Sequence, residues 1–161
     1  EKQRFLNAGS ELHGYKIALA ESGGLDAVVA SLRRSLSDAG AEVLTTHHPD
    51  WGSHALQANK FDADFCIGVE IRDQDPNVCH FLGEHFESPS GKQLGSAVAK
   101  NLQSLVPGIS SRGMKLPLLR ETRMPALLLR IDDVTTLVRN HHTMSLLITD
   151  ALRSFVEVGL D

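Results

Sequence analysis

The sequence predicts a single α/β domain with a mostly parallel, twisted sheet and helices on both faces. Short apolar segments alternate with segments in which apolar residues recur every three or four positions, an order typical of strand–helix repeats. One strand-like segment, residues 64–70, is almost continuously apolar, as in strands that are buried on both faces. The 161 residues and the 42% hydrophobic content suit one domain with its own core.

The expected elements follow from these two kinds of apolar spacing. Strands are expected over residues 4–8, 42–46, 64–70, 78–82 and 125–131. Helices are expected over about residues 25–40, 53–61, 88–105 and 141–157. Between them we expect a turn at 49–52, loops at 73–77 and 107–113, and an extended segment at 114–119.

Several helix ends carry the residues that favour such ends. Gly40 follows the last apolar residue of the first helix, where a glycine commonly ends a helix. Ser53 is expected to cap the second helix, and Pro89 suits the first turn of the third. Asp132 or Asp133 is expected to cap a short helical turn after the strand at 125–131.

Composition excludes some classes of function. The net charge of −4 leaves no basic surface for nucleic acid, and no apolar run approaches the roughly 20 residues of a membrane span. Cys66 and Cys79 both lie in apolar runs, so buried free thiols are expected rather than a disulfide. The chain begins with Glu1 rather than methionine and shows no signal peptide, so we expect a fragment of a longer protein.

Three motifs carry a resemblance to a known family. They are Ala58-Asn59-Lys60-Phe61-Asp62-Ala63-Asp64, Arg112-Gly113-Met114, and Leu118-Leu119-Arg120-Glu121-Thr122-Arg123-Met124-Pro125. In order and spacing the chain resembles the N-acetylmuramoyl-L-alanine amidase family of zinc enzymes, the amidase_3 type. The resemblance covers nearly the whole chain, so residues 1–161 are expected to form one amidase-like domain.

The resemblance also implies where an active site would lie. Such enzymes hold zinc with two histidines and a glutamate, and a second glutamate acts as the general base. The three ligand positions correspond to Ser10, Glu21 and Glu70, with Glu21 at the start of the first long helix, and the position of the base corresponds to Arg130. Serine is a poor zinc ligand, and a guanidinium cannot accept a proton.

These replacements predict a pseudoenzyme that needs no cofactor. Arg130 is expected to pair with Glu21 or Glu70 in a remnant pocket, so that a charged pair replaces the metal. Within the family the pattern is most similar to the CwlM type of actinobacterial pseudo-amidase. That similarity implies a cytoplasmic, regulatory protein-interaction domain in peptidoglycan precursor synthesis. The implied partner is the UDP-N-acetylglucosamine 1-carboxyvinyltransferase, with a Ser/Thr kinase acting on segments outside this chain.

Two alternatives remain open from the sequence. In one, the chain is an active metal-dependent amidase whose remodelled site uses His13, Glu21 and Glu70. In the other, it binds muropeptides as a sensor without cleaving them. The remaining histidines, including the adjacent pairs His47-His48 and His141-His142, are expected to lie at the surface or at helix caps.

Overall fold

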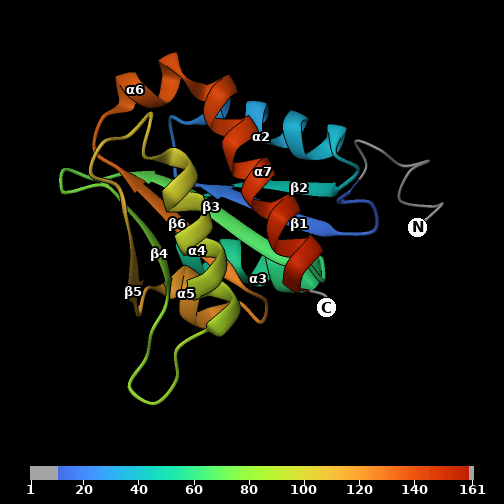
Figure 1. Ribbon diagram of the computed structural model, residues 1–161. Helices are drawn as coiled ribbons and strands as arrows, with labels where there is room; N and C mark the ends of the chain where they lie inside the picture. Colours follow the sequence, from blue (N-terminus) through green and yellow to red (C-terminus); the bar gives the residue numbers. More distant parts are fainter. Residues whose placement is uncertain (1–10, 160–161) are drawn as a thin grey trace.

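The computed structural model describes residues 11–159 and contains a six-stranded sheet in the order β2-β1-β3-β6-β4-β5 (Figure 1). Its strands are β1 (Lys16–Glu21), β2 (Glu42–His47), β3 (Phe65–Ile71), β4 (Asn77–Phe81), β5 (Ser110–Met114) and β6 (Ala126–Ile131). The first four strands in this order run parallel to one another. β4 and β5 are parallel to each other and antiparallel to β6. The expected single α/β domain with a mostly parallel sheet is confirmed.

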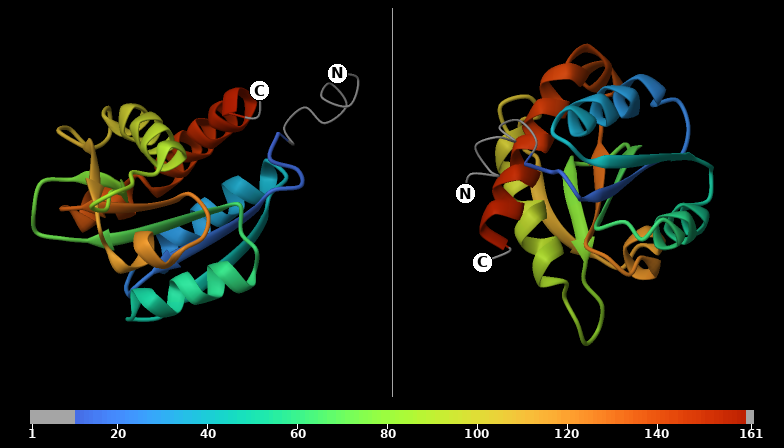
Figure 2. Two further views of the ribbon diagram at one scale, coloured as in Figure 1. Left: turned by 90° about the horizontal axis from the view of Figure 1, so that it is seen from below. Right: turned by 90° about the vertical axis from the view of Figure 1, so that its right-hand side faces the viewer.

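Helices cover both faces of this sheet. They are α2 (Asp26–Asp38), α3 (Trp51–Lys60), α4 (Pro89–Leu102), α5 (Pro117–Glu121), α6 (Val134–Arg139) and α7 (His141–Gly159). The larger apolar core lies between one face of the sheet and α2, α4 and α7, and a smaller one lies between the other face and α3 and α5 (Figure 2). Because successive strand residues point to opposite faces, Ile17 and Leu19 belong to the first core and Ala18 to the second.

Most of the predicted elements are present near their expected bounds. The strands at 42–46, 64–70, 78–82 and 125–131 correspond to β2, β3, β4 and β6, and the helices correspond to α2, α3, α4 and α7. Ser88 caps α4 by accepting from the backbone N–H of Gly91, and Asp133 caps α6 by accepting from Thr135 and Thr136. Gly40, which follows Ala39 at the end of α2, has a φ of 103°, a conformation that glycine permits.

Four local predictions are wrong. The cap of α3 is Asp50, not Ser53, so Trp51 and Gly52 belong to the helix rather than to a turn. Residues 110–114 form the edge strand β5 instead of a loop, and 117–121 form the short helix α5 instead of an extended segment. Residues 16–21 form β1, which was not predicted, while the expected strand at 4–8 lies outside the described residues.

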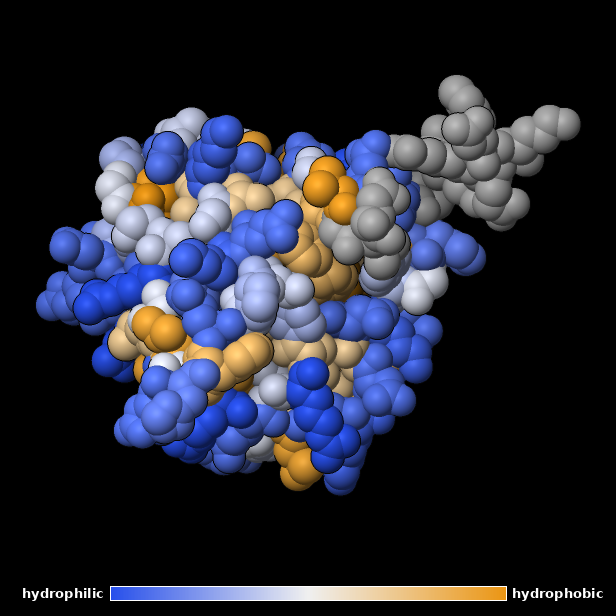
Figure 3. Space-filling view, turned by 60° about the horizontal axis from the view of Figure 1, so that its bottom comes forward, coloured by the Kyte–Doolittle hydropathy of each residue, from blue (hydrophilic) through white to orange (hydrophobic). Residues whose placement is uncertain are grey.

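Within residues 11–159 no helix is long and apolar enough to cross a bilayer. The face shown in Figure 3 is mostly hydrophilic, with separate apolar patches rather than one continuous apolar surface. A surface of this kind is ordinary for a globular domain, because scattered apolar side chains remain exposed on most proteins.

The two cysteines are free and buried, as predicted. Burial raises the pKa of the Cys66 thiol to about 12 and also raises the pKa of Cys79, where Arg130 and Arg112 oppose the shift. At pH 8 the Cys66 thiol is therefore ionised in about one molecule in ten thousand, and the thiolate is the reactive form.

We therefore expect neither thiol of the native protein to react with an aromatic disulfide reagent at pH 8 on the time scale of minutes. Both thiols should react at once in denaturant, which provides the control for reagent quality. A native protein that releases one equivalent of the chromophore immediately would contradict the burial of these side chains.

Candidate functional site

The carboxyl ends of the parallel strands β1, β2 and β3 lie at the same edge of the sheet. The strands that follow β1 in sequence lie on opposite sides of it. From β1 the chain moves outward through α2 to β2, and it then returns through α3 to β3 on the other side of β1. In open α/β sheets, ligands bind at the carboxyl edge beside such a reversal. The end of β1, which borders this reversal, is therefore a place where a site is expected.

Three potential metal ligands converge on one side of this edge. Glu21 ends β1 and is opposite His47, the last residue of β2. The Nδ1 atom of His47 lies 2.7 Å from Oε1 of Glu21 and 3.5 Å from Oδ1 of Asp26, the first residue of α2. The three ligand atoms all lie within 4.8 Å of one another. Glu21 is only 2% exposed, whereas His47 and Asp26 are 53% and 85% exposed, so the cluster opens to solvent on one side.

The loop after β1 fixes the Glu21 carboxylate. The backbone N–H groups of Gly23 and Leu25 donate to its Oε2 atom at 2.7 and 3.3 Å. Gly23 and Gly24 have φ values of 144° and 78°, a backbone conformation that side chains disfavour and glycine permits. This tight turn leaves Oε1 directed at His47.

Burial on its own would raise the pKa of Glu21. The hydrogen bonds from His47, Gly23 and Leu25 outweigh that effect and hold the pKa of the carboxyl below its ordinary value. Glu21 is therefore ionised at neutral pH, and the ionised carboxylate is the form that coordinates a metal.

A buried histidine supports the end of β2 from the other face. The Nδ1 atom of His54, on α3, lies 2.5 Å from the hydroxyl oxygen of Thr46. Its Nε2 atom donates to the carbonyl oxygen of His48 at 2.7 Å. Burial lowers its pKa, so the ring is neutral, with one nitrogen accepting and the other donating. These bonds fix the side chain of Thr46 and the backbone of His48, the two neighbours of His47.

The donor set fits a zinc-like divalent ion. Zn²⁺ accepts histidine nitrogen and carboxylate oxygen, and catalytic sites commonly offer three protein ligands and leave a further position for water. The backbone donors to Oε2 of Glu21 act as the outer contacts that usually orient a metal-binding carboxylate. A cleft of about 960 Å³ extends from this cluster along α2 and β2, and Arg33 and Arg34 are among its lining residues.

A second charged cluster lies on the opposite face of the sheet. Glu70 on β3 is opposite Arg130 on β6, and Nε of Arg130 lies 3.0 Å from Oε2 of Glu70. Arg72 approaches the same oxygen at 4.0 Å. Glu21 is in register with Val69, so Glu21 and Glu70 differ by one position and project to opposite faces.

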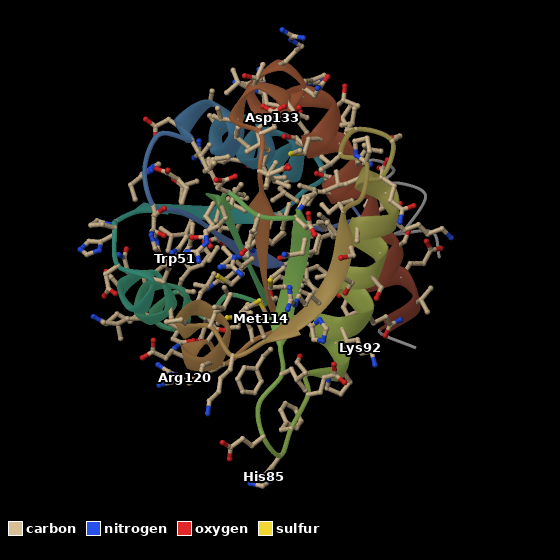
Figure 4. All side chains as sticks on the ribbon, turned by 90° about the vertical axis from the view of Figure 1, so that its left-hand side faces the viewer. Trp51, His85, Lys92, Met114, Arg120 and Asp133 are labelled. Carbon is tan, nitrogen blue, oxygen red and sulfur yellow. The ribbon has the colours of Figure 1, made fainter. Side chains whose placement is uncertain are left out.

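An apolar pocket of about 170 Å³ adjoins this second cluster. Trp51 and Leu118 form part of its wall, and Figure 4 shows Trp51 and Met114 from this side of the molecule. Gly68 at the centre of β3 makes room for that wall, because a Cβ atom there would lie 2.8 Å from Leu118 and 3.0 Å from Trp51. The pocket therefore depends on a strand glycine.

The structure separates several residues that the sequence had grouped. Arg130 contacts Glu70 as expected, but Glu21 takes no part in that pair. Glu21 ends a strand and does not begin the helix, which starts at Asp26. His13 lies beside Gly40 at the amino end of β1, so a site built from His13, Glu21 and Glu70 does not form. Ser10 lies outside the described residues.

Sequence reasoning missed Asp26 and His47 as potential ligands. His47 was assigned to the surface, and its relation to Glu21 becomes visible only when β1 is paired with β2. The available signal was the short loop of Glu21-Ser22-Gly23-Gly24-Leu25-Asp26, which brings an acidic residue at a helix start back towards a strand end. His47 is exposed, as expected, whereas His54 and His80 are buried.

Several solved structures have the same fold. An N-acetylmuramoyl-L-alanine amidase from Clostridium difficile 630 is 14% identical, with a TM-score of 0.74 over 89% of this chain and 97% of that one. The chain has the fold of these amidases. The catalytic domain of the CD27L endolysin targeting Clostridia difficile is 12% identical, with a TM-score of 0.71 over 87% of this chain and 97% of that domain.

The amidase fold recurs in a third structure, from another genus. The catalytic domain of the amidase CwlV from Bacillus (Paenibacillus) polymyxa var. colistinus is 14% identical, with a TM-score of 0.69 over 89% of this chain and 99% of that domain. No protein-family model matches the sequence, and no curated protein matches it.

These findings correct the prediction that the chain is not an enzyme. These three solved structures that share its fold are among several that match, and each is an amidase or an endolysin catalytic domain, that is, an enzyme. The amidase fold of this chain also carries the cluster of Glu21, Asp26 and His47, which the prediction overlooked. The same cluster bears against the expectation that the protein holds no cofactor.

Proposed function

We propose that this chain is a metal-dependent amidase domain that acts on peptidoglycan fragments, with the ion held by Glu21, Asp26 and His47. The convergence of these three side chains at the carboxyl edge of an amidase fold is the observation that supports the proposal. The metal-dependent alternative drawn from the sequence is thereby kept, but its ligands are different.

Each of the three residues has a distinct part in such a site. Glu21 supplies a buried, ionised carboxylate whose position is fixed by two backbone donors. His47 supplies Nδ1, which in the absence of metal donates to Glu21 and has to lose that proton to bind an ion. Asp26 supplies an exposed carboxylate on the cleft side. When bound, the ion would polarise an amide carbonyl and activate water.

Arg130 and Glu70 stand outside this proposed chemistry. They lie on the other face of the sheet, and a guanidinium cannot accept a proton. The cleft beside α2, rather than the pocket beside Trp51, is therefore the proposed place for the scissile amide.

The test combines metal content with hydrolysis. Protein purified without chelator and supplied with zinc should bind about one ion per chain and release peptide from muropeptides, and His47→Ala should lose both properties. The control is His142→Ala, which removes an exposed histidine on α7. Zinc binding and hydrolysis that survive in His47→Ala, or a native protein that binds no zinc on addition, would refute the proposal.

The protein partner expected from the sequence, the UDP-N-acetylglucosamine 1-carboxyvinyltransferase, stays a prediction. It is tested separately by mixing the two purified proteins and measuring both their association and the activity of the transferase. Because this interaction needs no metal, its outcome is independent of the zinc experiment.

A further inference from the structure

Arg130 has more hydrogen-bond donors than its surroundings use. A guanidinium carries five N–H donors, and this one is only 4% exposed. Its Nε donates to Glu70, Nη1 contacts the sulfur of Met114 at 3.3 Å, and the guanidinium also hydrogen-bonds the thiol of Cys79. Thioether sulfur is a weak acceptor. Within residues 11–159 no oxygen atom accepts a hydrogen bond from either Nη nitrogen of Arg130.

The charges around this guanidinium do not balance. Glu70 is the one acidic residue that lines the pocket of about 170 Å³, and both Arg130 and Arg72 line the same pocket. Nε of Arg72 lies 4.0 Å from Oε2 of Glu70, the same oxygen that pairs with Nε of Arg130. The pocket therefore has an excess of one positive charge at a partly desolvated place, where an anion would gain more than in bulk water.

The rest of the pocket is apolar. Trp51, Leu116, Pro117, Leu118 and Leu128 complete its lining. A volume of about 170 Å³ is below the range of sites that take a complete drug-sized ligand, so it suits a small molecule or the end of a chain. An anion with a short aliphatic part would satisfy both the guanidinium edge and this apolar wall.

We propose that the pocket between β3, β6 and α5 binds a carboxylate that carries a short aliphatic group, such as a small carboxylic acid or the C-terminal residue of a peptide. The Nη edge of Arg130 holds the carboxylate oxygens, Arg72 adds attraction from the rim, and Trp51 and Leu118 cover the aliphatic part. Guanidinium and carboxylate match each other in a planar, two-bond geometry. This site is separate from the proposed metal site and does not depend on it.

Trp51 provides the measurement, because it is the single tryptophan of the chain and lines the pocket. The full chain is titrated with sodium propionate at pH 7 and constant ionic strength while the fluorescence of Trp51 is recorded. We expect a saturable change with millimolar affinity, which is reasonable for a ligand with so few atoms. Propionamide, which has nearly the same shape without the charge, should produce no saturable change.

Variants then locate the binding. Arg72→Gln should weaken propionate binding about threefold, since it removes a half-exposed charge. Arg130→Lys keeps the charge but loses the planar fork, and should weaken binding about tenfold. The matched control is Arg120→Gln, an exposed position on α5 outside this pocket, which should leave the affinity unchanged. If Arg130→Lys does not fold, as judged by circular dichroism, Arg72→Gln and propionamide still decide the test.

Inorganic phosphate is the second probe. If phosphate saturates the Trp51 signal at lower concentration than propionate, the site is for phosphate and the carboxylate proposal is overturned. The proposal also fails if propionamide acts like propionate, or if no probe gives a saturable change. Saturable propionate binding measured without zinc would support this site even if the protein had no amidase activity. One proposal can therefore fail without the other.

Discussion

Replacing Arg130 by methionine is expected to destabilise the protein by about 3–5 kcal/mol, the largest effect on folding that we predict. The change removes the charge partner that lies 3.0 Å from Glu70 and leaves that carboxylate in a largely buried place. Arg72 compensates only weakly, because it lies at 4.0 Å and is half exposed. Equilibrium unfolding in urea measures the loss as a lower midpoint with an unchanged slope.

A double-mutant cycle distinguishes the contribution of the Arg130–Glu70 ion pair to stability from the contribution of side-chain packing. Arg130→Met combined with Glu70→Leu should recover most of the lost stability, because no buried charge is then left without a partner. Arg139→Met, which removes an exposed arginine on α6, should change the free energy of unfolding by less than about 0.5 kcal/mol. A double variant as unstable as Arg130→Met would show that the arginine acts through packing and not through Glu70.

Replacing Glu21 by glutamine is expected to lower zinc affinity at least about 100-fold. Changes that merely disturb the outer contacts of a metal site already reduce affinity 10- to 100-fold, and this change removes a charged ligand. Glutamine keeps the size of the side chain and can still accept from Gly23 and Leu25, so the turn after β1 should persist. Titration calorimetry with zinc on chelator-treated protein gives the affinities.

Glu42→Gln is the matched control for this change. Glu42 is an exposed residue at the start of β2, at the far end of the strand from His47, and its replacement alters the net charge equally. Its zinc affinity should equal that of the unmodified protein. If Glu21→Gln and the unmodified protein bound zinc with equal affinity, the metal site would not lie at the end of β1.

The elements that the sequence predicts well are those with a full apolar pattern. β6 is buried throughout and β3 is buried as far as Glu70, and α2, α4 and α7 each turn a regular apolar stripe to the core. β5 has no such pattern, because Ser110–Met114 is an edge strand with no fully buried residue. α5 has only five residues, too few to show a helical period.

The same distinction applies to the contacts at the two charged clusters. The Arg130–Glu70 contact could be anticipated because each residue is the last but one of a largely buried strand, and the two strands lie side by side in the sheet. The contact between Glu21 and His47 was not anticipated, because no strand was predicted at residues 16–21, and without that strand beside β2 the two residues have no reason to meet. A side-chain cluster at a sheet edge depends on strand register, and register is not encoded in any one segment.

The position of β6 has a consequence for how the protein is made. β6 lies at the centre of the sheet but is the last strand in sequence among the described residues, and it joins β3 on one side to β4 on the other. While the chain is being synthesised, β1, β2 and β3 can pair as soon as they emerge, and β4 can pair with β5. Until residue 131 has emerged, however, these two sub-sheets have no shared strand, and each presents an open edge to other chains. Chains that stall before β6 should therefore be the ones that aggregate or depend on chaperones, and the finished sheet should close in one late step.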